Sequence, residues 1–436
     1  MTSQVDAAAG GFDPFELPDT IQLGTADDPY PHLAVARRKG PVQLDWPLPD
    51  DVGTVHEDRD PSFSVLGHDE AMAVLRDHET YSSTVLVDVM GPVLEHAMIA
   101  MDEPEHRALR ALVAPAFRPK LLARWEHELV RRVVDELIDS LASAGRADLV
   151  RRLTFAFPVR VIARILGLPE GDSQQFQRWS IELISMIVNW DRGLAAWNAL
   201  RAYFEERAAE RRAQPQDDLI SELVQTEVDG QRLTDDDIFA FLILLLPAGI
   251  ETTYRSLGNL LFALLTHPDQ LDEAVKNPEL RASAIEEALR WETPLLMVPR
   301  RSVRNARLGG VDVPAGRDLN VFIGSANRDE RHYPEPDRFD IHRAPAPHMS
   351  FGSGPHMCLG MHLARMETRV ALDAILERLL TFVSIPQRPD PGSSAASSDR
   401  QTRSRPPSRP ELLGDLGWTA TVTLLSPSTY VLQARR

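Results

Sequence analysis

The longest apolar run in the sequence, IFAFLILLLPAGI, extends from Ile238 to Ile250. At 13 residues, with a proline and a glycine inside it, this run is too short to span a bilayer. Thr234 and three aspartates precede it, as at the N-terminus of a helix, and the helical pattern continues to about Thr266. Such a helix measures roughly 48 Å at 1.5 Å per residue. We therefore expect a long buried central helix that crosses the whole molecule, and no membrane anchor.

Most of the remaining chain also has apolar residues at helical spacing. Helices are predicted over 127–145, 284–291 and 361–380. Strand-like segments are few, and they occupy 41–46, 63–67 and 301–322, the last with Gly309-Gly310 as a turn. The pattern predicts a mainly α protein with a smaller β-rich lobe.

The length and the C-terminal composition suggest how the chain is organised. A chain of 436 residues exceeds what one simple core supports, so we expect residues 1–387 to form one globule with two lobes, or two domains. Residues 388–410 hold six Ser, five Pro and five Arg and no large apolar side chain, which predicts a disordered insert. The segment 411–436 alternates like a strand, so we expect it to return to the same domain.

Charge and cysteine content limit the partners and the compartment. The formal net charge of −17 argues against a nucleic-acid or anionic-membrane binder. The N-terminus has neither the basic nor the apolar region of a signal peptide. A single cysteine cannot form an intrachain disulfide, so a reducing, cytoplasmic setting fits best.

That cysteine, Cys358, lies in the glycine-rich stretch HMSFGSGPHMCLG. A lone cysteine is most often buried and inert. Here Gly360 begins a predicted helix, whose dipole and free N–H groups would stabilise a thiolate, either as a nucleophile or as a metal ligand. His356 and His362 do not complete a zinc pattern. A cysteine protease with a distant histidine and asparagine stays open.

A thiolate ligand to haem iron needs only one cysteine and also accounts for its neighbours. Phe351 can pack beside the sulfur, His356 can reach a propionate, and backbone N–H groups after Cys358 can tune the iron. Three glycines would admit the flat porphyrin: Gly352, Gly354 and Gly360.

From Phe351 to Gly360 the pattern Phe-Gly-x-Gly-x-His-x-Cys-x-Gly resembles the haem-binding signature of the cytochromes P450. Four other segments resemble family motifs in the family's order: DEPEHRALRALVAPAF at 102–117, AGIETT at 248–253, EALR at 287–290 and PDRF at 336–339. The resemblance covers roughly residues 15–385. It implies the P450 fold, with the long central helix over a haem b and the cysteine loop beneath it.

The resemblance also implies a role for each motif residue. Cys358 is the iron ligand, and four side chains are expected at the haem propionates: His106, Arg110, Arg300 and His356. Ala248 and Gly249 would leave space above the iron, and Glu251 and Thr252 would relay protons to bound oxygen. The plain alternative for Thr252 is a hydrogen bond back to the carbonyl of Ala248. A buried structural network is expected from Glu287, Arg290 and Arg338.

The implied function is a haem-thiolate monooxygenase that activates O2 and oxidises a C–H bond of a lipophilic small molecule. A haem-thiolate peroxygenase or non-hydroxylating oxidase is the alternative, and a non-haem helical protein with an inert Cys358 is a further one. The expected pocket residues are mostly apolar: Val85, Met90, Ile184, Leu244, Leu296 and Val298.

Electrons must come from outside, because one cysteine cannot hold an iron–sulfur cluster and no flavin domain is evident. A ferredoxin with an NAD(P)H-linked ferredoxin reductase is the expected donor to a monomeric enzyme. We expect the ferredoxin to dock on the cysteine side, at a basic patch. Its residues are Arg118, Lys120, Arg365 and Arg369.

Overall fold

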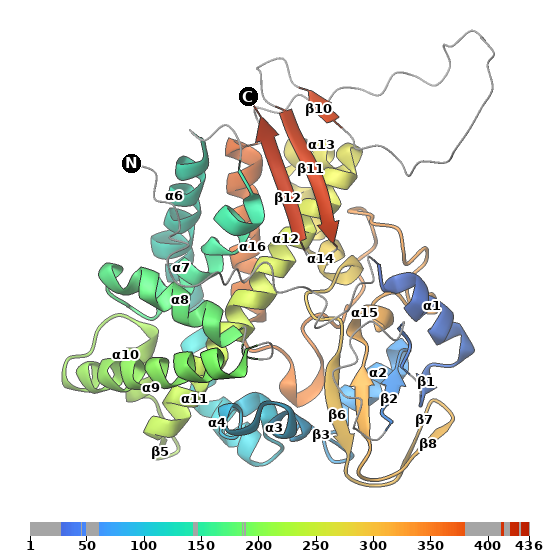
Figure 1. The fold of residues 1–436 in the computed structure, drawn as a ribbon, viewed down its shortest axis with the longest axis horizontal. Helices are drawn as coiled ribbons and strands as arrows, with labels where there is room; N and C mark the ends of the chain where they lie inside the picture. The colour runs from blue at the N-terminus through green and yellow to red at the C-terminus, as the bar shows by residue number, and fades with distance from the viewer. Residues whose placement is uncertain are drawn as a thin grey trace.

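The computed structural model describes residues 28–44, 46–48, 61–142, 147–184, 186 and 189–379, and three strands within 411–435. The predicted insert, 388–410, lies outside the described residues, so its disorder stays a prediction. Among the described residues a helical lobe and a smaller sheet-containing lobe lie side by side (Figure 1). The mainly α architecture with a β-rich lobe is therefore confirmed.

The predicted central helix is present and consists of three consecutive parts. They are α11 (Asp235–Leu246), a π-helical turn (Pro247–Glu251) and α12 (Thr252–Thr266). Thr234 caps the N-terminus: its hydroxyl accepts a hydrogen bond from the Asp237 backbone N–H at 3.1 Å, and the Asp237 carboxylate accepts one from the Thr234 N–H at 2.9 Å.

The π turn has a local cause in the sequence. Pro247 has no N–H to donate to the carbonyl four residues earlier, and its ring crowds that carbonyl. The helix widens by one residue at this point and then resumes at Thr252. By length and hydropathy Asp235–Thr266 would also suffice to cross a membrane. Its position as the central helix, with half of the most apolar window buried in the fold, accounts for that composition instead.

The other helices surround this central one or cover the sheet (Figure 1). Their bounds are α1 (Tyr30–Lys39), α2 (His68–Arg76), α3 (Val85–Met90), α4 (Glu105–Val113), α5 (Pro119–Trp125), α6 (Arg131–Ala142), α7 (Ala156–Ile165), α8 (Ser173–Ile184), α9 (Trp190–Ala213), α10 (Leu219–Gln225), α13 (Pro268–Lys276), α14 (Arg281–Trp291), α15 (Ile323–Ala326) and α16 (Met361–Arg378). The largest apolar cluster is shared by the central helix, α6, α7, α14 and α16. The helix predicted over 127–145 is shorter, because Glu126–Val130 forms a π turn ahead of α6.

The smaller lobe contains a five-stranded sheet in the order β1-β2-β9-β6-β3. Its strands are β1 (Val42–Gln43), β2 (Phe63–Val65), β9 (Asp318–Val321), β6 (Val298–Ser302) and β3 (Tyr81–Ser82). Only β2 and β9 pair in parallel. The predicted Gly309-Gly310 turn joins β7 (Ala306–Leu308) to β8 (Val311–Val313), with φ of +54° and +85° that favour glycine.

Two short sheets complete the described structure. β4 (Glu227–Val228) and β5 (Gln231–Arg232) form a hairpin just before the central helix. Near the C-terminus β10 (Glu411–Leu413), β11 (Thr419–Ser426) and β12 (Thr429–Arg435) form an antiparallel sheet in that order. The strand expected from the alternating pattern is thus present as β11, while the division of the chain into 1–387, 388–410 and 411–436 stays a prediction.

Candidate active site

The cysteine loop is closed by its own backbone just before α16 begins. The N–H of Cys358 donates to the Phe351 carbonyl at 2.8 Å, and the N–H of Met357 donates to the Gly354 carbonyl at 3.1 Å. These bonds fix the sulfur at the entrance to α16, in which Gly360 is the N-cap. The loop therefore presents one thiol from a fixed backbone, as a metal ligand requires.

Burial raises the pKa of the Cys358 thiol, although the Gly360 N–H and the charges of Arg110 and Arg365 lower it. Burial therefore opposes the thiolate that the Gly360 N–H and the two arginine charges favour. A metal cation bound to the Cys358 sulfur would offset the effect of burial, because coordination to a metal deprotonates a thiol outright.

The glycines of the loop differ in what surrounds them. Gly352 and Gly354 have φ of +70° and +72°, where other residues are strained. A Cβ on Gly354 would collide with the carbonyl oxygen of Leu75 and come within 2.9 Å of the Arg76 Cα, so this glycine lets the loop pack on α2. A Cβ on Gly360 would meet no protein atom within 4 Å. Gly360 thus leaves open space beside the sulfur, as a flat cofactor requires.

The four residues expected at the haem propionates are brought together. His106 and Arg110 are one turn apart on α4, and the rings of His106 and His356 are 4.1 Å apart between centroids. Arg110 donates to the Met357 carbonyl at 2.6 Å, next to the cysteine. The charge of Arg300 acts on His356 and contributes to lowering its pKa. Four basic groups from α4, β6 and the cysteine loop therefore converge on one region.

This cluster has more positive charge than the protein neutralises. Arg300 is 7% exposed and forms no ion pair with any residue that the structure describes; burial lowers its pKa to about 10. The buried Nε2 of His106 has no hydrogen-bond partner within the same part of the chain. Burial, His106 and the two arginines lower the pKa of His356 to about 3. Two carboxylates would satisfy these groups, so the residues present fit the propionates of a haem.

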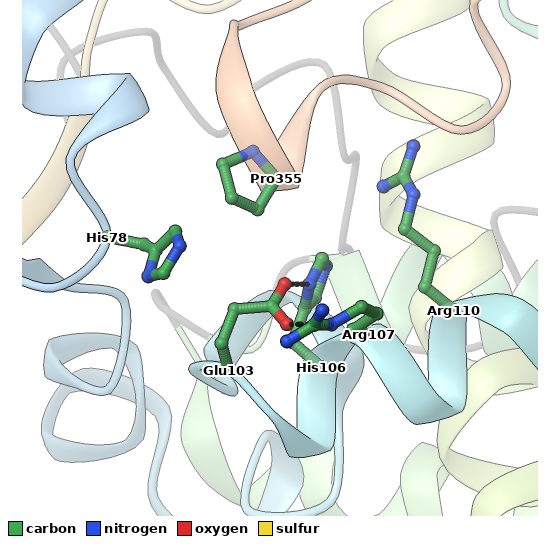
Figure 2. Close-up of a pocket in the computed structure, with 6 residues that line it drawn as sticks. All are labelled: His78, Glu103, His106, Arg107, Arg110 and Pro355. Atoms are coloured by element: carbon green, nitrogen blue, oxygen red, sulfur yellow. Dashed lines mark hydrogen bonds and ion pairs between the residues drawn. The ribbon is translucent and has the colours of Figure 1, made fainter.

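A pocket of about 400 Å³ opens at this cluster. Figure 2 shows it between α4 and the cysteine loop: Glu103 joins His106 and Arg107, while Arg110 extends toward the loop. The Glu103 carboxylate accepts from His106 Nδ1 at 3.1 Å, which leaves the unpartnered Nε2 as the free position of that ring. Glu103 is a residue that sequence reasoning missed; its place one turn before His106 and Arg107 was the available signal.

The two residues expected to handle protons are adjacent: Glu251 ends the π turn, and Thr252 begins α12. The Thr252 hydroxyl donates to the Ala248 carbonyl at 2.6 Å, which is the plain alternative named above. Glu251 is ion-paired with Arg255, with 2.9 Å between Oε1 and NH2. The sequence pattern did not predict this ion pair, and the proton relay stays a prediction.

Gly249 has a packing role that the sequence did not predict. Its missing side chain faces α7, where a Cβ would lie 2.8 Å from Cδ1 of Ile162. The glycine therefore permits close packing of the π turn on α7. Space above the iron at Ala248 and Gly249 stays a prediction.

The predicted buried network is present, but one member differs. Glu287 and Arg290 are 4% and 2% exposed and form two contacts of 2.8 and 2.9 Å. Arg338, the expected third member, is exposed and pairs with Glu335 at 3.5 Å. Arg343 takes its place, with Nε at 3.0 and 3.1 Å from the two Glu287 oxygens. Arg338 contributes only its backbone carbonyl, which accepts from Arg290 and Arg343.

The expected pocket residues lie in several places. Ile184 and Leu244 are half-buried against the main core, Val85 is buried, and Val298 packs on the sheet core. Leu296 packs against α15, where its Cδ1 lies close to Gly324, so core packing accounts for it. The side chain of Met90 is outside the described residues. Their role as a pocket stays a prediction.

The expected basic patch is largely neutralised within the protein. Arg118 pairs with Glu222 at 3.0 Å, Arg369 with Glu126 at 2.6 Å, and Arg365 with Glu286 at 2.7 Å. The guanidinium of Arg365 also lies over the Phe351 ring, at 4.4 Å from its centroid. This contact holds the Phe351 ring at the start of the cysteine loop, so Arg365 also stabilises the structure of the loop.

Comparison with known proteins decides the family. The model of the family described as Cytochrome P450 matches residues 173–397, about half of the chain. The chain belongs to the cytochrome P450 family. The erythromycin C-12 hydroxylase of Saccharopolyspora erythraea is 40% identical in an alignment of 352 positions that covers 77% of this chain and 86% of that protein.

Other relatives agree with this assignment. The cytochrome P450 monooxygenase PikC of Streptomyces venezuelae is 36% identical over 375 residues, covering 83% of this P450 and 87% of PikC. Among solved structures, CYP109E1 from Bacillus megaterium in complex with corticosterone has a TM-score of 0.72 at 33% identity, over 81% of this chain and 90% of that one.

As a P450, the protein is a haem-thiolate monooxygenase, and Cys358, the only cysteine, supplies the axial thiolate. The haem, when bound, supplies the chemistry that activates O2 for insertion of one oxygen atom into a substrate. His106, Arg110, Arg300 and His356 would hold its propionates, and the Phe351–Gly360 loop would hold the sulfur. The protein thus contributes binding and orientation.

Proposed function

We propose that this P450 hydroxylates a large lipophilic molecule of the macrolide class. The observation that carries the proposal is the 40% identity over 77% of the chain with an erythromycin C-12 hydroxylase. A polyketide biosynthesis P450 of Bacillus subtilis, 32% identical over 73% of this chain, adds to it. The half-buried apolar residues Ile184, Leu244 and Val298 supply the adaptable surface that such a substrate needs.

A steroid is the second candidate. The solved CYP109E1 complexes with corticosterone and testosterone, at 33% and 30% identity, favour it. Both candidates are bulky and mostly apolar, so the same pocket chemistry serves either.

Proton delivery is assigned to Thr252 and Glu251. The Thr252 hydroxyl would exchange its bond to the Ala248 carbonyl for one to bound oxygen, while a Glu251 carboxylate released from Arg255 would pass protons inward from solvent. This pair favours an O2-activating monooxygenase over a peroxygenase or a non-hydroxylating oxidase.

Electrons are assigned to a ferredoxin and its NAD(P)H-linked reductase, acting on a monomeric cytoplasmic enzyme. The docking face is proposed around Met357, which is 39% exposed and adjacent to Cys358. Lys120 lies outside the ion pairs that occupy Arg118, Arg365 and Arg369, so it is the patch residue best placed to meet an acidic partner.

The test is a panel of ligands added to the purified ferric protein. Erythromycin-type macrolides, testosterone and a long-chain fatty acid would each be scored by the Soret shift that follows loss of the axial water. Turnover with a surrogate ferredoxin and reductase would then be scored by a product heavier by one oxygen atom. The proposal predicts a saturable shift and a hydroxylated product with the macrolide. A response to the steroid or fatty acid alone would overturn the macrolide assignment.

A control separates failure of the substrate proposal from failure of the site. Reduced protein with CO should show the red-shifted Soret band of a thiolate opposite the CO, and Cys358→His should lose it while keeping haem. A protein that shows this band but ignores the macrolide refutes only the substrate class.

A further inference from the structure

A second cluster of metal-ligand side chains lies on the sheet-containing lobe, apart from the cysteine loop. It consists of His68 and Asp69 at the start of α2 and His332 in the loop after α15. These three residues come from two segments more than 260 positions apart, yet one potential ligand atom from each lies within 4.8 Å of the others. Within the described residues it is the sole group of three such side chains at this spacing.

The distances in the cluster suit a tetrahedral ion. The Asp69 Oδ1 is 3.0 Å from Nε2 of His332 and 3.6 Å from Nδ1 of His68. Ligand bonds of about 2.0–2.1 Å at tetrahedral angles place neighbouring ligand atoms about 3.3 Å apart. The two observed distances lie on either side of this value.

One ligand atom of the cluster lacks a hydrogen-bond partner. Nδ1 of His68 is buried, and within the described part of the chain it makes no hydrogen bond. A buried ring nitrogen without a partner costs free energy, and an ion held between it and the Asp69 carboxylate would remove that cost.

The backbone that carries the two histidines is held by one buried residue, Asp329. Its carboxylate accepts from the N–H of His68 at 2.9 Å, and its carbonyl accepts from the N–H of His332 at 2.9 Å. Arg331 in turn donates to the Asp329 carboxylate at 2.6 Å. Asp329 is fully buried, so the two segments cannot separate without exposing it. This support fixes the backbone positions of both histidines, so that ion binding needs only a side-chain movement.

We propose that His68, Asp69 and His332 form a binding site for a divalent transition ion of the zinc class, with water as the fourth ligand. Two imidazoles and one carboxylate with an open position are a ligand set that zinc uses. The His68 and His332 rings stack at 3.9 Å between centroids. An imidazole nitrogen binds a metal in the plane of its ring, so the His332 ring must turn until both ring planes contain the ion. That side chain is 32% exposed and lies at the surface, where it can turn.

The ion would join α2 to the 329–333 loop. The other end of α2 supports the cysteine loop, through Leu75 against Gly354 and through Arg76 Nε, which donates to the Ser353 hydroxyl at 3.0 Å. We therefore expect the ion to stabilise the lobe on which the cysteine loop packs.

The experiment uses the haem-loaded protein after dialysis against a chelator, with Zn²⁺ as the probe in isothermal titration. The expected result is one Zn²⁺ per chain. His332→Gln or Asp69→Asn should weaken it by at least the order of tenfold that loss of even an outer partner costs. Each variant should keep the Soret band and the CO band, which shows that it is folded. Addition of Zn²⁺ should raise the melting temperature of the unmodified protein and not that of Asp69→Asn.

A matched control uses a second surface histidine. His342 pairs with Glu273 at 2.8 Å, but it lies outside the three-residue group, so His342→Gln should leave Zn²⁺ binding unchanged. The proposal is overturned if the unmodified protein binds no Zn²⁺ at millimolar concentration. It is equally overturned if the His332 and Asp69 variants bind it as well as the unmodified protein, because the ion would then lie elsewhere.

Discussion

Arg343, and not the expected Arg338, is the third member of the buried network, and this difference can be tested by measuring stability. Arg343→Met removes two contacts to Glu287, a carboxylate whose side chain is 3% exposed. Arg338→Met instead removes a 3.5 Å contact between two exposed side chains. The two variants delete the same charge five residues apart, and only one of them leaves a buried carboxylate with fewer partners.

The magnitude follows from what Glu287 retains. Removing one partner of a buried ion pair costs about 3–5 kcal/mol. Glu287 keeps both contacts to Arg290 and the hydrogen bond from the Asp340 N–H, so we expect the lower end, about 3 kcal/mol. That is more than about a hundredfold in the unfolding equilibrium. Arg338→Met should cost under about 1 kcal/mol, as for other surface ion pairs.

The assay is a urea titration followed by the CO band of the reduced protein, which reports the intact haem-thiolate site. Arg343→Met should move the midpoint well below that of the unmodified protein, and Arg338→Met should leave it nearly in place. In a Glu287→Gln background the effect of Arg343→Met should be smaller, because the buried charge is gone and only the loss of the hydrogen bonds from Arg343 to three backbone carbonyls remains. Equal midpoints for the two arginine variants would refute this reasoning.

Three further perturbations test other parts of the site. Gly354→Ala should cost more than the about 1–2 kcal/mol of its left-handed φ and should lower haem content, because the methyl meets the Leu75 carbonyl; Gly310→Ala, with φ of +85° and open space, is the control, and equal haem content in both variants would contradict the packing argument. Thr252→Ala should keep haem and melting temperature but divert NAD(P)H to hydrogen peroxide, measured as peroxide and product per NAD(P)H; unchanged coupling would leave Thr252 as a helix-bending residue only. Burial raises the pKa of Glu286, but hydrogen bonds from Arg365 and His348 outweigh it and bring the pKa to about 2, below its ordinary 4.5. Because this folded pKa is lowered, the stability from Glu286 is present above pH 4.5 and lost as the pH falls toward 2, so Glu286→Gln should flatten the acid unfolding curve there, and an identical curve would count against the pairing.

Local signals predicted the parts of the fold that depend on local physics. The capped start at Thr234, the glycine turn at 309–310 and the loop that ends at Cys358 each follow from a few adjacent residues, and each is present. The convergence of His106 and Arg110 with the cysteine loop came from motif resemblance, since nothing in the spacing relates α4 to a segment about 250 positions away.

Other features could not be predicted because they depend on which side chain reaches a buried group. Arg343 and Arg338 have the same chemistry and are five residues apart, and only the path of the chain decides which one turns toward Glu287. The packing of Gly249 against Ile162 depends on the π turn that contains the glycine, and a regular helical repeat of 3.6 residues does not place it. The pKa of Cys358 depends on how deeply the thiol is buried, which its neighbours in sequence do not reveal.

The π turn at Pro247–Glu251 makes the central helix two helices out of phase. One added residue rotates everything after it by about 100°, the angle of one position in a helix with 3.6 residues per turn. The apolar sides of α11 and α12 are thus aligned to different neighbours by a single insertion. A deletion within this turn would restore a regular helix, yet it would swing the Thr252 half away from its present surroundings. A substitution within the π turn changes one side chain, whereas the loss or gain of one residue rotates every side chain of α12 about the helix axis.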